Sequence, residues 1–266
     1  MSDDSHAAGD VERPIEETDE LAVRSAFDAP GRSPALIERL NGFVEVVLCS
    51  DYPTQFAVAQ VLALAGMTPF TRGGGLSARY VFALELVDSA LLILLVLWLL
   101  RLHGESARDL LFGGRRMVRE AGLGLLLIPA VFLTVVLVLG VLQGLTPSLH
   151  NVARNPLEAL ISSRGGAWMF SIVAVVGGGL REEIQRAFVL RRFERYLGGA
   201  PLGLVLFSLV FGSGHIIQGW DVAITTAALG LFWGIAYLAR RSAVAPMVSH
   251  AGFNLAQIIR YTLWGP

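Results

Sequence analysis

Two adjacent glutamates and two histidines, spread over three apolar segments, are the residues of this sequence with the most obvious chemistry. Glu182 and Glu183 come shortly after the run WMFSIVAVVGGGL, His215 ends the run PLGLVLFSLVFGSGH, and His250 stands four residues before Asn254 in a third segment. A carboxylate beside an imidazole can deprotonate a single water molecule. A second imidazole with an amide can donate hydrogen bonds to a developing oxyanion. These residue types therefore predict a hydrolytic site without a serine or cysteine nucleophile.

The same side chains also permit plainer interpretations. A lone histidine such as His215 is more often a packed, hydrogen-bonded side chain of a bundle, and His250 with Asn254 can bond helices together. Arg186 lies four residues after Glu182, the usual spacing of a helical ion pair, and is expected to be a structural counter-ion. A zinc site built from glutamate and two histidines is an alternative, although the HExxH spacing of zinc proteases is absent.

The composition places these segments in a membrane. The chain is 54% hydrophobic and 16% charged, whereas soluble domains are about 25% charged. Its mean hydropathy is +0.59. The predicted fold class is therefore all-α, a polytopic transmembrane helix bundle, with membrane lipid as a partner and no nucleic acid. The single cysteine, Cys49, excludes an internal disulfide and a cysteine-based metal cluster, and is expected to be a packing residue.

About seven spans, within a range of six to eight, follow from apolar runs of sufficient length. They are predicted at 53–70, 79–101, 120–145, 167–190, 201–218, 221–239 and 243–264. The amphipathic segment ALIERLNGFVEVVLCS before the first span can lie on the membrane surface. Arginine-rich and arginine-poor connectors alternate, which puts the amino terminus in the cytoplasm and the carboxyl terminus outside. We expect an integral protein of a bacterial inner membrane.

Three parts of the chain differ in character. Residues 1–34 carry nine acids against three arginines, a net charge of −6, and are predicted to be a disordered cytoplasmic tail. Residues 35–119 hold the amphipathic segment and the first two spans, and residues 120–266 hold the candidate catalytic bundle. Ionisable residues at the centre of a membrane helix cost on the order of 2.5–3.5 kcal/mol each. Their convergence on three helices therefore predicts a polar intramembrane cavity.

The other ionisable residues considered are expected to have structural roles or to be exposed to solvent. Glu85 and Asp88 lie in the second span without a partner histidine, and are expected to provide polar packing or to line the cavity. His6, His103 and His150 fall in the tail and in connectors, where they are expected to be solvated.

At this point the residues resemble the CAAX-protease and bacteriocin-processing (CPBP) family of intramembrane glutamic proteases, which includes the Rce1 prenyl-protein endopeptidases. The family's marks are EExxxR on one helix, FxxxH on the next and HxxxN on a later one. FGSGH matches the second mark as Phe211 to His215, and HAGFN matches the third as His250 to Asn254. The resemblance covers roughly residues 120–264.

The first motif departs from the family pattern because it reads EExxR, one residue short. Anchored on the glutamates, Glu182 is the water-activating base and Glu183 the second carboxylate, with Arg186 shifted by a fraction of a turn. Anchored on the later stretch RAFVLRR, Arg181 takes the place of the base and Glu182 becomes the second glutamate. One residue is about 100° of helical rotation, so the choice matters. Glu182 is the favoured base, Glu183 the alternative, and an inactive relative a third possibility.

The resemblance implies an intramembrane endopeptidase that needs no metal or other cofactor. Glu182 and His215 would activate water, while His250 and Asn254 would stabilise the oxyanion. The substrate would be a membrane-associated peptide, prenylated or bacteriocin-like, that enters laterally or from the cytoplasm. The alternatives are a non-catalytic scaffold or bacteriocin-immunity protein on the same fold, and a proton-coupled transporter. The lack of an internal repeat counts against the transporter.

Overall fold

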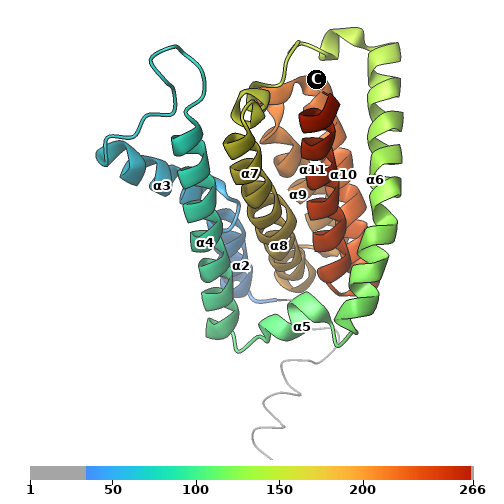
Figure 1. Cartoon of the computed structure of the whole chain (residues 1–266). Helices are drawn as coiled ribbons and strands as arrows, with labels where there is room; N and C mark the ends of the chain where they lie inside the picture. Colours follow the sequence, from blue (N-terminus) through green and yellow to red (C-terminus); the bar gives the residue numbers. More distant parts are fainter. Residues whose placement is uncertain (1–33, 265–266) are drawn as a thin grey trace, which may run out of the picture. The chain divides into compact units, whose positions relative to one another are not determined.

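Helices make up nearly all of the protein in this computed structural model, which describes residues 34–264 (Figure 1). This part of the chain contains no strand and a single isolated bridge, between Phe70 and Leu76. The predicted all-α fold is confirmed. The predicted acidic tail, apart from Pro34, lies outside the described residues, as does His6.

The helices from residue 36 onward belong to one unit. In chain order they are α2 (Leu36–Leu48), α3 (Tyr52–Leu64), α4 (Ala78–Leu102), α5 (Ala107–Phe112), α6 (Met117–Leu145), α7 (Arg164–Val173), α8 (Glu182–Tyr196), α9 (Ala200–Ser213), α10 (Trp220–Arg240) and α11 (Val244–Trp264). Three short 3₁₀-helices lie in connectors, at Pro147–Leu149, Pro156–Ile161 and Ile216–Gln218. A π-helix, Ala174–Arg181, joins α7 to α8, so that residues 164–196 form one continuous rod.

Apart from the short connector 49–51, the connectors fall at two opposite ends of this unit (Figure 1). We call the end with α5 and connectors 103–116, 197–199 and 241–243 the arginine end, and the end with connectors 65–77, 146–163 and 214–219 the loop end. The arginine end carries Arg101, Arg108, Arg115, Arg116, Arg119, Arg191, Arg192, Arg195, Arg240 and Arg241, and the loop end carries Arg72, Arg79, Arg154, Arg164 and Arg260.

Three of the described helices are long and apolar enough to cross a membrane, namely α4, α6 and α10. The predicted count of about seven spans stays a prediction. The first predicted span, 53–70, extends past the helix that forms there, because α3 ends at Leu64. Gly66 then adopts a left-handed conformation with φ +78°, which commonly ends a helix. With 13 residues and a rise of 1.5 Å per residue, α3 is about 20 Å long, shorter than the hydrocarbon core of about 30 Å.

The predicted amphipathic segment forms α2. This helix buries Gly42 and Glu45 but exposes apolar side chains such as Phe43 and Val47. A helix that turns its apolar face outward suits contact with lipid rather than with water. Cys49, which follows α2, is free and fully buried in the main core, as predicted.

The main core surrounds α8. Its buried members on this helix are Ile184, Ala187, Phe188, Val189 and Leu190, which pack against apolar residues of α4 and α9. A second core between α6, α10 and α11 contains Val131, Leu229, Trp233 and Phe253. The two cores hold α8, α10 and α11 together, and these helices carry most of the predicted site residues.

Candidate active site

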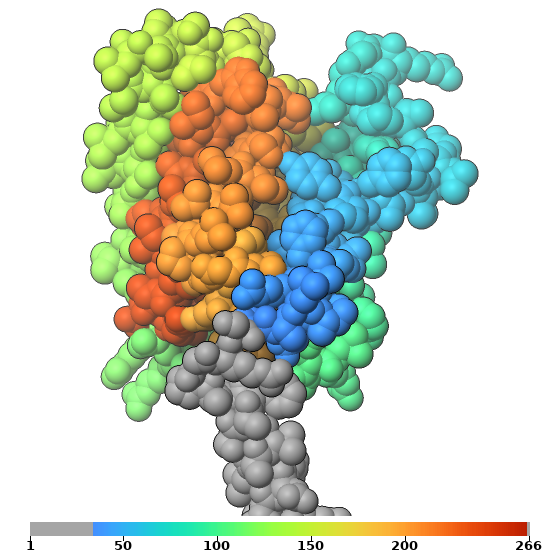
Figure 2. All heavy atoms as spheres, turned by 180° about the vertical axis from the view of Figure 1, so that it is seen from behind, coloured from blue at the N-terminus to red at the C-terminus, as the bar shows by residue number. Residues whose placement is uncertain are grey.

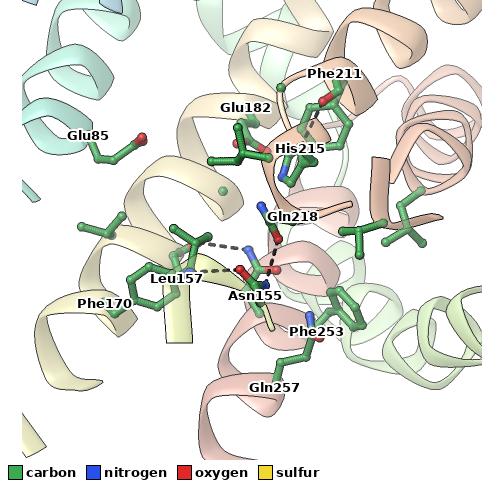
Figure 3. Close-up of a pocket in the computed structure, with 18 of the residues that line it drawn as sticks. Glu85, Asn155, Leu157, Phe170, Glu182, Phe211, His215, Gln218, Phe253 and Gln257 are labelled. Carbon is green, nitrogen blue, oxygen red and sulfur yellow. Dashed lines mark hydrogen bonds between the residues drawn. The ribbon is translucent and has the colours of Figure 1, made fainter. Parts of the chain in front are cut away.

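A cavity of about 560 Å³ lies beside Glu182. Residues of α3, α4 and every helix from α6 to α11 line it, together with the π-helix and the connectors 49–51, 146–163 and 214–219. Figure 3 shows Glu182 and His215 close together at one end of this cavity, while Gln257 lies at the other. The cavity therefore brings three of the predicted catalytic residues, Glu182, His215 and Asn254, from separate segments to one place.

Two glycines of the π-helix allow α11 to come close to the glutamates. A Cβ atom at Gly178 would lie 2.5 Å from Nδ2 of Asn254, and one at Gly179 would lie 2.6 Å from Cβ of Ala251. A real Cβ cannot stand at such a distance, so a larger residue would push α11 away. The run of glycines in the sequence is thus the local cause that places His250 and Asn254 opposite Glu182.

Three consecutive residues where the π-helix meets α8 point in three directions. Arg181 faces Asp51 on the α3 side, Glu182 lines the cavity, and Glu183 faces His250 on α11. This divergence follows from the rotation of about 100° per residue in a helix. Of the two glutamates, Glu182 therefore faces the empty space and Glu183 faces protein.

Glu183 has two partners, both at one of its oxygens. Its Oε1 lies 2.8 Å from Nδ1 of His250 and also pairs with Nη1 of Arg186, and the side chain is 1% exposed. Arg186 thus pairs with Glu183 at a spacing of three, not with Glu182 at a spacing of four. The predicted Glu182–Arg186 pairing was wrong, because the Glu182 side chain turns to the cavity. Arg186 does have a counter-ion, as predicted.

The fully buried guanidinium of Arg186 is enclosed by aromatic rings. Its Cζ lies 5.3 Å from the ring centre of Phe207, 5.1 Å from that of Phe211 and 5.7 Å from that of Trp233. Within the described chain, its Nε and Nη2 have no hydrogen-bond partner. Aromatic faces attract a cation and partly replace the missing hydrogen bonds.

The imidazole of His250 is fixed from several sides. Trp233 stacks on it with ring centres 3.7 Å apart and an angle of 16°, and the ring of Phe211 lies perpendicular to it with centres 6.2 Å apart. Trp233 donates its own Nε1 hydrogen to Oγ of Ser249 at 3.0 Å. A carboxylate only accepts, so Nδ1 of His250 carries the hydrogen in its bond to Glu183. The other nitrogen, Nε2, lies 3.7 Å from Oε2 of Glu182.

His215 follows the carboxyl end of α9. Its Nδ1 donates to the backbone oxygen of Phe211 at 3.1 Å, since a carbonyl oxygen only accepts. Nε2 of the neutral ring is then a proton acceptor. The ring packs edge-on against Phe211, with centres 5.4 Å apart. This tautomer suits a residue that receives a proton from water or orients it.

A smaller pocket of about 90 Å³ brings four of the predicted site residues together. Glu182, His215, His250 and Asn254 all line it. The amide of Asn254 is one turn beyond His250, and its Nδ2 lies 3.5 Å from the backbone oxygen of Ala174. A water molecule takes about 30 Å³ in the liquid, so the pocket has room for a water molecule and a small polar group.

Sequence reasoning missed an ionic cluster on the other side of Glu182. Nη1 of Arg181 lies 3.2 Å from Asp51, and its Nη2 lies 3.6 Å from Glu85 and 3.7 Å from Asp88. Glu85 lines the cavity and Asp88 is fully buried, so both expected positions occur. Their partner Arg181 was not predicted. The signal was the presence of two acids in one apolar segment and an arginine in another, since buried charges need partners.

The connector histidines are less free than predicted. His103 lies 2.6 Å from Glu45, and His150 lies 2.8 Å from Asp221. Both are partly exposed to solvent, but each has an acidic partner that the sequence pattern did not indicate. Trp233, the neighbour of His250, was also missed, because a tryptophan in an apolar helix gives no sign of what it stacks on.

No group of three or more His, Cys, Asp or Glu side chains is arranged to hold a metal ion within residues 34–264. The zinc site considered from the sequence would need such a group. The arrangement found here combines a cavity-facing carboxylate, a neutral imidazole with a free acceptor, and a second imidazole fixed by a carboxylate. It can do acid–base chemistry on a bound water molecule.

Residues 164–256 match a family model described as Rce1-like, type II CAAX prenyl endopeptidase. The search of curated proteins gave no match, and the search of solved structures gave none either. The matched range begins with α7 and ends in α11, and it includes every predicted site residue. The resemblance drawn from the sequence motifs is confirmed.

Proposed function

We propose that this chain, whose residues 164–256 form an Rce1-like domain, is an intramembrane endopeptidase that hydrolyses a peptide bond with water activated by Glu182 and His215. Rce1-like proteins form a protease family, which supports peptidase activity at that level. The observation that carries the finer proposal is the shared pocket, where Glu182, His215, His250 and Asn254 surround one space of about 90 Å³.

In the proposed reaction, Glu182 takes a proton from the bound water while Nε2 of His215 orients it. The oxygen of that water attacks the carbonyl carbon of the substrate. The carbon–nitrogen bond then breaks, and the proton held at Glu182 passes to the leaving amine. Hydroxyl thus ends on the acyl fragment and hydrogen on the amine, so the atoms balance. A positioned general base typically contributes 10²- to 10⁴-fold in rate.

Asn254 and His250 would stabilise the negative charge that develops on the carbonyl oxygen. Preorganised donors of this kind are worth about 10²- to 10³-fold each. To donate from Nε2, His250 must carry hydrogens on both nitrogens. The carboxylate of Glu183 at Nδ1 and the stacked ring of Trp233 fix the imidazole so that Nε2 lies on the side of Glu182. Glu183 and Arg186 therefore support the oxyanion site rather than act on water.

The choice of Glu182 as base follows from the surroundings of the neighbouring residues. Glu183 is 1% exposed and already holds Arg186 and His250, whereas the side chain of Glu182 is 18% exposed and lines the cavity. Arg181 is held by carboxylates on its other side. Only Glu182 of these three combines a proton-accepting group with access to a water molecule and a substrate.

A cleavage assay with the purified, detergent-solubilised protein tests the proposal. The substrates are quenched-fluorescence peptides, including prenylated members, and a chelator is added in a parallel series. We expect Glu182→Gln and His215→Ala to lose at least 10²-fold in rate and the chelator to have no effect. Full activity of Glu182→Gln would contradict the proposal. Inhibition by the chelator would favour a metal mechanism, and a failure of the wild type on every peptide would favour the scaffold.

A further inference from the structure

The cavity ends abruptly on one side of Glu182. Every residue from Glu183 to Leu190, on the arginine-end side of Glu182 along α8, is buried. Apart from Gln185, which borders the cavity and donates to the backbone oxygen of Cys49, their side chains belong to the main core or to the Glu183–Arg186 pair. The fully buried Arg192 closes the packing by pairing with Glu45 and Glu105. None of the described residues in the connectors of the arginine end lines the cavity.

On the other side of Glu182, five helices line the cavity with their loop-end halves, whereas α7 lines it with the half that joins the π-helix. These residues are Val81 and Glu85 of α4, Val135 and Leu139 of α6, Phe170 and Val173 of α7, Val210 and Phe211 of α9, Val222 and Thr225 of α10, and Gln257 and Tyr261 of α11. Connectors of the loop end add Asn155, Glu158 and Gln218. The cavity therefore runs from Glu182 toward the loop end.

We infer that the substrate of the proposed peptidase reaches Glu182 through the loop end, and that this end faces away from the cytoplasm. Arginine-rich connectors stay on the cytoplasmic side of a membrane, and the described arginines concentrate at the opposite end. The inference rests on the proposed function for its substrate. The family resemblance implies lateral or cytoplasmic entry, and packed core and ion pairs fill the path from the cytoplasmic side.

The walls of the cavity indicate which kind of peptide it accepts. Phe170, Phe253 and Leu139 provide apolar surface, while Gln218 and Gln257 provide amide groups on the way to Glu182. An extended peptide has unpaired backbone groups that need such partners, and its side chains can rest on the apolar walls. The substrate is thus an extended segment with apolar side chains, presented on the extracytoplasmic side.

Hydrogen bonds between separate segments hold the rim of this entrance in place. Asn155 donates to Oε1 of Gln218 at 3.0 Å, and Oδ1 of Asn151 accepts from the backbone of Trp220 at 3.0 Å. To one side, the hydroxyls of Tyr52 and Ser213 are hydrogen-bonded at 3.0 Å, where α9 (golden orange) lies beside the α2–α3 corner (blue) in Figure 2. The residues of the rim therefore have fixed positions, so a cysteine placed there can be labelled to test the entrance.

Single cysteines at the two ends test the entrance. In a Cys49→Ala background, Glu158→Cys marks the rim of the cavity, and Arg108→Cys on exposed α5 is the control. We expect a membrane-impermeant maleimide to label Glu158→Cys in intact cells, and Arg108→Cys only after the membrane is permeabilised. Bulky labelling should lower cleavage by Glu158→Cys at least tenfold relative to the same unlabelled variant, and leave cleavage by Arg108→Cys unchanged.

Failure of the entrance and failure of the proposed peptidase function can be told apart, because the labelling is measured independently of cleavage. Labelling of Arg108→Cys from outside intact cells would overturn the assignment of sides. Full cleavage by labelled Glu158→Cys would overturn the entrance itself. If Glu158→Cys is labelled from outside and the wild type cuts no peptide, the entrance is supported while the proposed function fails.

Discussion

The rod formed by residues 164–196 has two halves that differ in how many charged residues they carry and in how much of the cavity they line. The first half, α7 with the π-helix, has no charged residue between Arg164 and Arg181, yet it lines the cavity. The second half, α8, carries most of the charges of the rod and borders the cavity only at its start, with Glu182 and Gln185.

The difference teaches that charge in a membrane helix does not by itself mark a reactive site. Arg186 and Arg192 are both fully buried, the first paired with Glu183 and the second with Glu45 and Glu105, and neither lines the cavity. Glu182, by contrast, has open space before it. A charged group can act on a substrate only where its neighbours leave space beside it. The variants below compare buried, paired charges with Glu182, which borders the cavity.

The largest effect is expected from Arg186→Leu. It would leave the buried carboxylate of Glu183 without its counter-ion, which typically costs 3–5 kcal/mol. Unfolding in detergent, followed by melting temperature or denaturant, measures this loss. The double variant Glu183→Leu with Arg186→Leu should regain most of the stability, because replacing a buried pair by apolar residues is often neutral, yet it should stay inactive. A loss below about 1 kcal/mol in Arg186→Leu would mean that the buried Glu183 does not need this counter-ion.

A smaller effect, on catalysis rather than on folding, is expected at Trp233. Its ring stacks on His250 with centres 3.7 Å apart and holds the imidazole in the orientation in which it would donate to the oxyanion. Misplacing one oxyanion donor costs up to about 10²-fold in rate. We expect Trp233→Leu to lower kcat by up to this factor with little change in KM, and Trp233→Phe to restore part of it. The exposed Trp168 of α7 offers a matched control. An equal fall of kcat in Trp168→Leu would refute a specific role of the stack.

The glycines of the π-helix come next in size. In Gly179→Ala the new Cβ would meet Ala251 at 2.6 Å, and such overpacking costs typically 1–3 kcal/mol. It should also weaken cleavage, because α11 moves away with His250. Gly122→Ala on α6 is the control, since nothing lies within 4 Å of its added Cβ. Equal unfolding midpoints of the two variants would show that the close approach of α11 does not depend on this glycine.

Sequence spacing was sufficient to place the residues that lie on regular helices. His250 and Asn254 are four residues apart and share one face of α11, and Phe211 and His215 mark the end of α9 near them. The convergence of three apolar segments at similar depth also predicted a polar cavity. These features depend on helical periodicity, which a sequence carries directly.

Spacing failed where geometry depends on packing between distant segments. Nothing in AVVGGGLR distinguishes a π-helix from an α-helix, because the widened turn depends on the close approach of α11. The partners of Arg181 come from α3 and α4, far away in the chain. The end at which the cavity opens also depends on how completely α8 is covered, and no motif records that.

The smallest effect is expected at the exposed edge of α8, where Arg241 donates two hydrogen bonds of 2.7 Å to Glu194. These bonds lower the pKa of Glu194 below its usual range, so the pair stabilises the fold above about pH 4.3 and the contribution is lost as the pH falls through the lowered value. The two side chains are 29% and 53% exposed, and exposed pairs are worth about 0.2–1 kcal/mol. Glu194→Gln should therefore lower the melting temperature slightly at pH 7 and leave it unchanged near pH 2. A loss as large as that of Arg186→Leu would show that burial does not separate the two kinds of charge on this rod.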